Sequence, residues 1–193
     1  MELIELIIDE KNPDHGIDAV SVVESPAIEE NFIALNKQQV QLKEIDQEKR
    51  ILMGPALTPN KKIYRKDDKT NREWEIFFSE KTVRKAMELF FQRGNQGQAT
   101  YEHKDAYVPG MTVVESWLIE DSEKDKSTLY GFDLPKGTWM ISMKVENDDI
   151  WKKVKSGEVK GFSIEGYFAD KYEMSIQQSA NNEIINQLKK LLQ

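Results

Sequence analysis

The sequence contains no cysteine, only two histidines, and no long apolar run. The absence of cysteine excludes disulfides, thiolate catalysis and cysteine-ligated zinc, and it fits a cytosolic setting. No apolar run approaches the ~20 residues that a membrane-spanning helix requires. The first nine residues begin acidic and alternate in polarity, which is typical of a strand and not of a signal peptide. We therefore expect no contact with a membrane.

The balance of charge is acidic, with a net charge of −7 at pH 7. A general nucleic-acid binder needs a basic face, so we expect no nucleic-acid partner. Basic residues do cluster between residues 61 and 72, but acidic residues are interspersed among them, which is typical of a solvated hairpin. A chain of 193 residues with 39% hydrophobic content can form one good core.

Several familiar binding motifs are missing from the sequence. There is no Walker-type phosphate loop, no dinucleotide-binding fingerprint and no His-Glu-x-x-His zinc motif. The acidic loop at residues 121–125 lacks the spaced ligands and the glycine of a calcium loop. The sequence therefore predicts neither a cofactor nor a metal.

The residue patterns predict many short strands and few helices. Strand patterns occupy residues 2–9, 17–23, 50–57, 62–65, 73–78, 99–103, 111–120, 137–145 and 160–168. Helices are expected after Ser79 to about Arg93, after Asn147 or Asp148 up to Gly157, and in an amphipathic segment at about 181–192. Residues 33–48 are interpreted as an exposed strand-to-loop connection or a mobile insertion. The fold class is mainly β (α+β), a barrel or a sandwich with peripheral helices.

The most informative segment is Lys160-Gly161-Phe162-Ser163-Ile164-Glu165-Gly166-Tyr167-Phe168. As a strand it places Phe162, Ile164 and Phe168 on one face and Ser163, Glu165 and Tyr167 on the other. Gly161 and Gly166 leave room for a neighbouring backbone. The Gly-x-Ser-x-Gly nucleophile elbow is absent. Ser163 could nevertheless act as a nucleophile if a base can reach it.

A serine hydroxyl needs an imidazole to take its proton and a third group to orient that imidazole. His103, in the expected strand at residues 99–103, is the candidate base, because His15 lies in a turn between Asp14 and Gly16. Glu115 is the first candidate for the third member, since it shares the face of an otherwise apolar strand and a buried carboxylate needs a partner. Glu165 is the alternative, because it shares the face of Ser163.

An ordered set of segments also carries a family resemblance. The set comprises residues 19–32, 53–59, 63–65, 103, 114–117, 135–140 and 157–166. Together these segments resemble the XkdF-type phage serine proteases, which are relatives of the prohead maturation proteases and of herpesvirus assemblin. The resemblance covers roughly residues 1–170 and leaves residues 171–193 as a tail that ends in the amphipathic helix.

The resemblance implies a β-barrel of the assemblin and prohead-protease type, surrounded by helices, with Ser163 as nucleophile and His103 as base. It implies a prohead maturation endopeptidase that cleaves scaffold and major capsid proteins in the host cytoplasm, inside the assembling prohead. A homodimer is a further expectation, and the terminal helix could serve dimerisation or scaffold docking, or pack on its own barrel. The alternatives are a catalytically silent head protein that binds scaffold or capsid, and a β-rich binding domain unrelated to phage.

Overall fold

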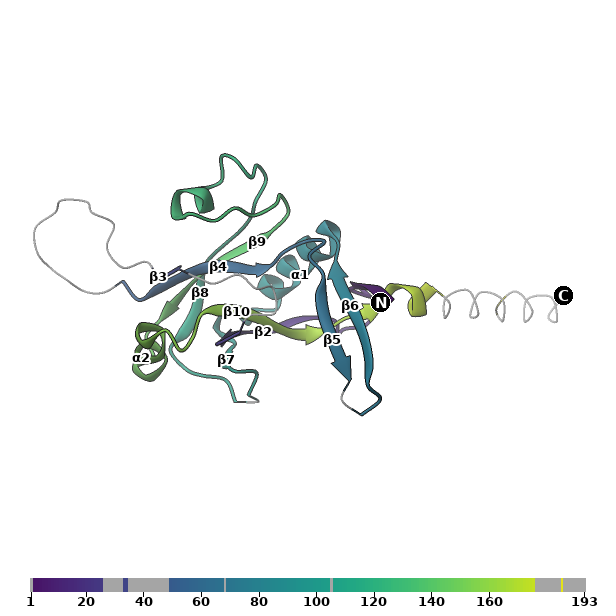
Figure 1. Ribbon diagram of the computed structural model, residues 1–193, viewed down its shortest axis with the longest axis horizontal. Coiled ribbons are helices and arrows are strands. Elements are labelled where there is room, and N and C mark those ends of the chain that lie inside the picture. The colour runs from purple at the N-terminus through teal and green to yellow at the C-terminus, as the bar shows by residue number, and fades with distance from the viewer. Residues whose placement is uncertain are drawn as a thin grey trace, which may run out of the picture.

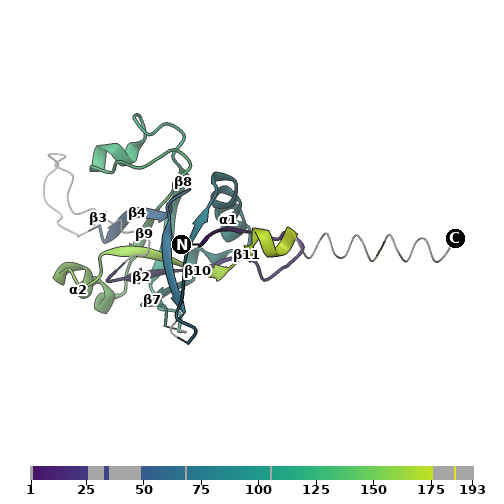
Figure 2. The same ribbon diagram turned by 45° about the vertical axis from the view of Figure 1, so that its right-hand side comes forward.

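The computed structural model describes residues 2–25, 33–34, 49–67, 69–104, 106–175 and 185. Within these residues the protein is mainly β, with three hydrogen-bonded sheets, two α-helices and two short 3₁₀ helices (Figures 1 and 2). Residues 171–175 are also helical. The expected terminal helix and nearly all of residues 33–48 fall outside the described residues.

The strands form three separate sheets, which we name A, B and C. Sheet A has the order β11 (Ala169–Asp170), β1 (Glu2–Ile7), β6 (Arg72–Phe78) and β5 (Ile63–Asp67). Sheet B has the order β10 (Gly161–Tyr167), β2 (Gly16–Val23) and β7 (Ala99–Tyr101). Sheet C has the order β3 (Ile33–Ala34), β4 (Ile51–Leu57), β9 (Trp139–Val145) and β8 (Met111–Leu118).

The expectation of a closed barrel is not met, because the three sheets do not join into a ring in the described part of the chain. Among the strands that the structure describes, β5 has β6 as its one neighbour and β10 has β2, so both are sheet edges. The sheets are instead united by one apolar core, to which residues of all three contribute. That core buries Phe78 of sheet A, Phe162 of sheet B and Trp139 of sheet C.

The two α-helices form where the sequence predicts them. Helix α1 (Glu80–Gln92) buries Val83, Ala86 and Phe90, and the Phe90 ring meets that of Trp139 edge-on at a centroid distance of 5.5 Å. The spacing of these residues gives one apolar stripe that packs on the core.

Helix α2 (Asp148–Ser156) begins at Asn147, whose Oδ1 accepts hydrogen bonds from the backbone N–H groups of Asp149 and Ile150. It ends at Gly157, which adopts the left-handed conformation with φ of 74°. Figure 1 shows β10 extending between α2 and the β5–β6 hairpin.

The 3₁₀ helices η1 (Asn95–Gly97) and η2 (Lys126–Tyr130) complete the described elements. Asp125, in the acidic loop before η2, caps this helix. Its carboxylate accepts a 2.8 Å hydrogen bond from the N–H of Ser127. Both carboxylate oxygens of Asp125 also accept from the indole N–H of Trp117, at 3.1 Å each. Asp125 therefore serves to fix the loop.

Candidate active site

Ser163 lies in β10, and the expected alternation of this strand is present. Phe162 and Ile164 point to the main core, whereas Ser163 and Glu165 point to the opposite face of sheet B. Ser163 is 9% exposed, and its hydroxyl makes no hydrogen bond to any residue that the structure describes. A hydroxyl without a partner is available to an incoming group.

A row of three hydroxyl side chains crosses the same face of sheet B. Ser163 of β10 is paired with Ser21 of β2, and Ser21 is paired in turn with Thr100 of β7. Directly paired residues point to one face with their Cβ atoms about 4.5–5.5 Å apart in an antiparallel pair. Ser21 and Thr100 are almost completely buried. Sequence reasoning missed both, because their place on the face of the candidate nucleophile depends on how β10, β2 and β7 pair.

His103 is held over this face by a tight turn and not by a strand, which corrects the expected strand at residues 99–103. Strand β7 ends at Tyr101, and both Glu102 and His103 have φ of 53°, in the left-handed region. The N–H of His103 donates to Ser21 Oγ at 3.1 Å. The turn is also held by Glu102, whose carboxylate accepts from the N–H of Glu24 at 2.6 Å. These bonds fold the imidazole back over the hydroxyl row.

Glu165 is the carboxylate that meets the imidazole. His103 Nδ1 lies 3.2 Å from Glu165 Oε1, and the same oxygen accepts a hydrogen bond from Thr100 Oγ1. A neutral imidazole that donates from Nδ1 keeps its lone pair on Nε2, the nitrogen that a general base uses in a Ser-His-acid arrangement. The His103 side chain is 46% exposed and that of Glu165 is 28% exposed, so the pair lies at the edge of solvent.

Ser163 and His103 are not hydrogen-bonded to each other. They nevertheless share one face of sheet B, and Ser21 connects them, since it pairs with Ser163 and accepts from the His103 N–H. The main core lies on the other face of the sheet, so no apolar layer separates the hydroxyl from the imidazole.

A second carboxylate, Asp18, joins this cluster through an irregularity in β2. Glu165 is paired with Ala19 but Gly166 is paired with Ile17, so Asp18 is an extra residue beside Glu165. Burial raises the pKa of Asp18; Arg93 opposes that rise, while Asp14 and Glu165 add to it. In the sequence, Asp18 could have been noticed as an acidic residue among apolar ones. Its position beside Glu165, however, depends on the bulge.

Gly166 confirms the expectation of a close backbone approach next to the site. A Cβ atom at this position would lie 1.9 Å from the carbonyl oxygen of Gly16. Only glycine can occupy the bulge without displacing β2, and the bulge in turn sets the direction of Glu165.

Glu115, the first candidate for the third member, lies in sheet C and contacts other partners. Its carboxylate forms an ion pair with Lys126 and accepts from Ser142 Oγ at 2.7 Å. Burial acts to raise the pKa of Glu115, but the bonds from Lys126 and Ser142 outweigh it and hold the pKa below its ordinary value. A bulge between Val113 and Glu115 shifts the alternation of β8, so Glu115 faces away from the main core. The structure thus brings Glu165 to His103, and not Glu115.

His15 lies in the turn that the sequence predicts. Its Nδ1 accepts from the N–H of Asp9 at 3.2 Å, and its backbone is bridged to Tyr167. Tyr167 is four residues along β10 from Ser163, about 13 Å at 3.3 Å per residue. His15 is therefore poorly placed to act on Ser163.

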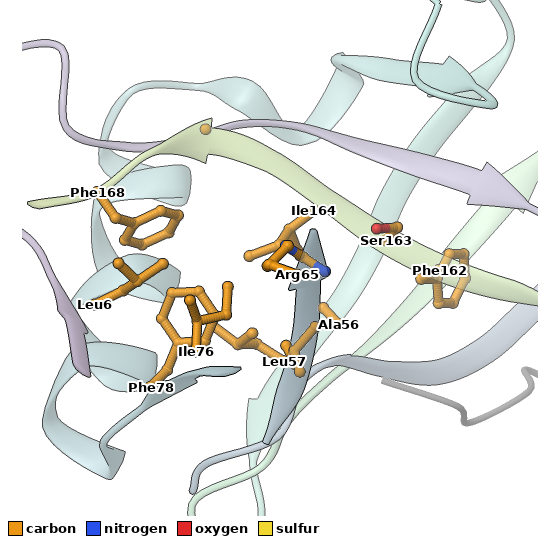
Figure 3. Close-up of a pocket in the computed structure, with 12 residues that line it drawn as sticks. Leu6, Ala56, Leu57, Arg65, Ile76, Phe78, Phe162, Ser163, Ile164 and Phe168 are labelled. Atoms are coloured by element: carbon orange, nitrogen blue, oxygen red, sulfur yellow. The ribbon is translucent and has the colours of Figure 1, made fainter. Parts of the chain in front are cut away.

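A partly open cavity of about 230 Å³ adjoins β10, and Ser163 is among the residues that line it (Figure 3). Its walls are mostly apolar and come from β10, from the end of β4, and from the inner face of sheet A. Within the described residues, no group of three or more His, Asp or Glu is placed to hold a metal ion. None of the helices described is long and apolar enough to span a bilayer.

Comparison with protein families matches residues 39–173 to the family described as "Putative phage serine protease XkdF". The matched span contains Ser163, His103, Glu165 and Glu115, whereas β1 and β2 precede it. No match was found among curated proteins or solved structures. Because the match covers more than half of the chain, the protein belongs to this family.

Proposed function

We propose that the protein is a serine endopeptidase in which Ser163 is the nucleophile, His103 the general base and Glu165 the group that orients His103. The observation that supports this most directly is the contact between His103 Nδ1 and Glu165 Oε1 on the face that carries Ser163. Membership of a family of phage serine proteases adds to it. Glu115 is assigned no part in the reaction.

In the first half of the reaction, the Ser163 hydroxyl gives its proton to His103 Nε2 while Oγ bonds to the scissile carbonyl carbon. For this transfer Nε2 and Oγ must approach to about 2.6–3.2 Å, and such contacts are often longer before substrate binds. Collapse of the tetrahedral species breaks the C–N bond, and the imidazolium gives its proton to the leaving amine.

In the second half, water attacks the acyl ester and passes a proton to His103, which returns it to Ser163 Oγ as the carboxylic acid product leaves. Glu165 keeps its negative charge throughout and stabilises the imidazolium that forms in each half. The Thr100 hydroxyl holds the Glu165 carboxylate in place by its hydrogen bond.

We further propose that the substrates are extended segments of scaffold and major capsid proteins, cleaved in the host cytoplasm inside the assembling prohead. This part of the proposal, like the relation to the assemblin fold and a homodimeric state, rests on the family resemblance. An extended segment could bind by adding a strand at the outer edge of β10, with backbone hydrogen bonds.

The test compares the wild type with Ser163→Ala and with Ser156→Ala, a control at an exposed serine of α2. We expect a fluorophosphonate probe to label the wild type and the control on Ser163, and Ser163→Ala to remain unlabelled. Cleavage of a co-expressed scaffold should fall by about 10⁴-fold or more in Ser163→Ala, because the nucleophile is lost. Undiminished scaffold cleavage by Ser163→Ala contradicts the proposal.

A second candidate function is a catalytically silent head protein that binds scaffold or capsid on the same fold. The missing hydrogen bond between Ser163 and His103 favours it. This candidate predicts that the wild type binds scaffold, that Ser163→Ala binds it equally well, and that the probe labels neither. Labelling of Ser163 in the wild type excludes it.

A further inference from the structure

The cavity beside Ser163 has apolar walls and a single charged side chain. The walls are formed chiefly by Leu6, Leu57, Ile76, Phe78, Phe162 and Phe168. The charged side chain is that of Arg65, which comes from the β5–β6 hairpin and not from the sheet that carries Ser163 (Figure 3). Its position raises the question of what the guanidinium binds.

The alternation of β5 places Arg65 on the side of the strand that borders the cavity. Ile63 and Arg65 share this face and both line the cavity; Ile63 is buried, whereas the Arg65 side chain is also exposed to solvent. Tyr64 and Lys66 lie on the other face, and both are exposed. The hairpin thus presents Arg65 where a solvent-open cavity begins, and Lys66 on the face away from it.

Arg65 has no acidic partner among the residues that the structure describes. Its one hydrogen bond runs from Nη1 to the backbone carbonyl of Tyr64, at 3.1 Å. Two carboxylates of the hairpin have other partners: Glu75 pairs with Lys62 at 3.1 Å, and Asp67 accepts from Thr70 and from the N–H of Lys69. Glu73 is opposite Lys66 in the β5–β6 register, on the face away from Arg65.

The other arginines of the described chain are satisfied. Arg50, Arg72 and Arg84 each form an ion pair with a carboxylate at 2.7–2.8 Å, and Arg93 donates to two backbone carbonyls. Partial desolvation beside the apolar walls lowers the pKa of Arg65, although its side chain remains exposed to solvent. A carboxylate ligand would supply the ion-pair partner that Arg65 lacks among the described residues.

We propose that this cavity is a specificity pocket that accepts an acidic side chain of the peptide substrate, with Arg65 as the residue that pairs with its carboxylate. The proposal rests on the protease function proposed above. An extended peptide along the edge of β10 would direct alternate side chains toward the core face of that strand, where the cavity lies.

Glutamate fits both parts of the pocket better than other residues. Its methylene groups can pack on the apolar walls while its carboxylate accepts two parallel hydrogen bonds from the guanidinium. The cavity, at about 230 Å³, exceeds the 150 Å³ that holds benzene in an engineered apolar cavity, so it can hold one side chain. A lysine or arginine at this subsite would be repelled by Arg65.

The test is cleavage profiling of a peptide library by the wild-type full chain, followed by kinetics on matched peptides that differ only as Glu or Gln at the selected position. We expect acidic residues to be enriched at one fixed position near the cleaved bond. The wild type should prefer Glu over Gln by about 10- to 100-fold in kcat/KM, the range expected for a charge-assisted hydrogen bond.

The variants Arg65→Gln and Arg65→Glu sharpen the test, and Lys66→Gln is the matched control because Lys66 has the same charge on the outer face of β5. We expect Arg65→Gln to lose the preference, Arg65→Glu to favour Lys or Arg at that position, and Lys66→Gln to behave as wild type. Labelling of Ser163 by the fluorophosphonate probe at the wild-type rate shows that each variant keeps its active fold. Arg65→Lys, which keeps the positive charge, should retain part of the preference.

The outcomes separate the two proposals. If the wild type cleaves peptides without an acidic preference, or if Arg65→Gln keeps that preference, the pocket assignment is wrong and the protease function stands. If the wild type neither cleaves peptides nor reacts with the probe, both proposals are overturned. The wild-type profile alone decides the pocket assignment even if a substitution at Arg65 prevents folding.

Discussion

Two glutamates in two different sheets have nearly the same kinds of partners. Glu165 of sheet B accepts from the Thr100 hydroxyl and meets the His103 imidazole, whereas Glu115 of sheet C accepts from the Ser142 hydroxyl and meets the Lys126 ammonium. We call these the Glu165 cluster and the Glu115 cluster. Both lie on the face of their sheet that points away from the main core.

The nitrogen partner distinguishes the two clusters. The Lys126 ammonium forms an ion pair with Glu115 and also lies over the Trp117 ring, 4.0 Å from the centroid. An imidazole can gain or lose a proton near neutral pH, so Glu165 can assist a proton transfer. The clusters also differ in what lies next to them, because only the Glu165 cluster adjoins a hydroxyl without a partner, that of Ser163. A carboxylate with a hydroxyl partner is therefore a weak sign of catalysis until its nitrogen partner is known.

The largest expected effect that separates the clusters comes from replacing each glutamate by glutamine. Glu165→Gln should lower kcat by about 10²- to 10⁴-fold, because an amide can donate to Nδ1 and so favour the tautomer in which Nε2 cannot accept the proton of Ser163. Glu115→Gln should leave kcat close to wild type. The measurement is steady-state hydrolysis of a peptide substrate across a range of pH.

The pH profile distinguishes a positioning role of Glu165 from a merely structural one. A structural defect lowers activity by the same factor at every pH. Loss of the carboxylate also shifts the part of the pH–rate profile that reports the ionisation of the general base. Equal kcat losses in Glu165→Gln and Glu115→Gln would remove the distinction between the clusters and leave the third member unassigned.

Local patterns predicted the Glu165 cluster in part. Alternation alone placed Ser163 and Glu165 on one face of a strand, because side chains in a strand alternate with a period of two whatever the strand pairs with. The position of His103 was predicted wrongly as a strand, since two successive left-handed residues that are not glycine are uncommon. Their conformation depends on Ser21, 82 residues away in the sequence.

The expected face of Glu115 was correct only in part, for a related reason. Glu115 shares a face with Trp117 as expected, but the bulge between Val113 and Glu115 places Val113 on the other face, toward the main core. The bulge depends on how β8 pairs with β9 and cannot be read from one strand.

In the fold, too, the features with local sequence signals were predicted and those that depend on distant residues were not. The β5–β6 hairpin and helices α1 and α2 were predicted because their signals are local: a charged turn between apolar strands, an apolar stripe, and capping residues. The parallel pairings of β1 with β6 and of β2 with β7 were not predicted. They join strands that are far apart in the sequence, and such pairings are selected by packing on a shared core.

An intermediate effect is expected from removing one hydroxyl in each cluster. Ser21→Ala removes the acceptor of the His103 N–H, so the left-handed turn loses an anchor. One such hydrogen bond contributes about 1 kcal/mol, so kcat/KM should fall by about fivefold. Ser142→Ala should lower the free energy of unfolding by a similar ~1 kcal/mol and leave kcat/KM unchanged. Urea unfolding and peptide hydrolysis, measured on both variants, test this pair. A loss of activity in Ser142→Ala as large as that in Ser21→Ala would show that stability, and not the position of His103, governs the rate.

The smallest effect concerns acid stability, where the Glu115 cluster should be visible by itself. The pKa of Glu115 is held below its ordinary value of 4.5 by Lys126 and Ser142, against the effect of burial, so the ionised form stabilises the folded state. That contribution is present above the ordinary value and is lost as the pH falls through the lowered one. Glu115→Gln should therefore reduce the free energy of unfolding at pH 7 by at most about 1 kcal/mol, as for an exposed ion pair, and the difference from wild type should vanish in acid. Urea unfolding of both proteins at pH 7 and near pH 3 tests it. A deficit of equal size at both pH values would mean that the glutamine disrupts packing around Lys126 and that the charge on Glu115 contributes nothing.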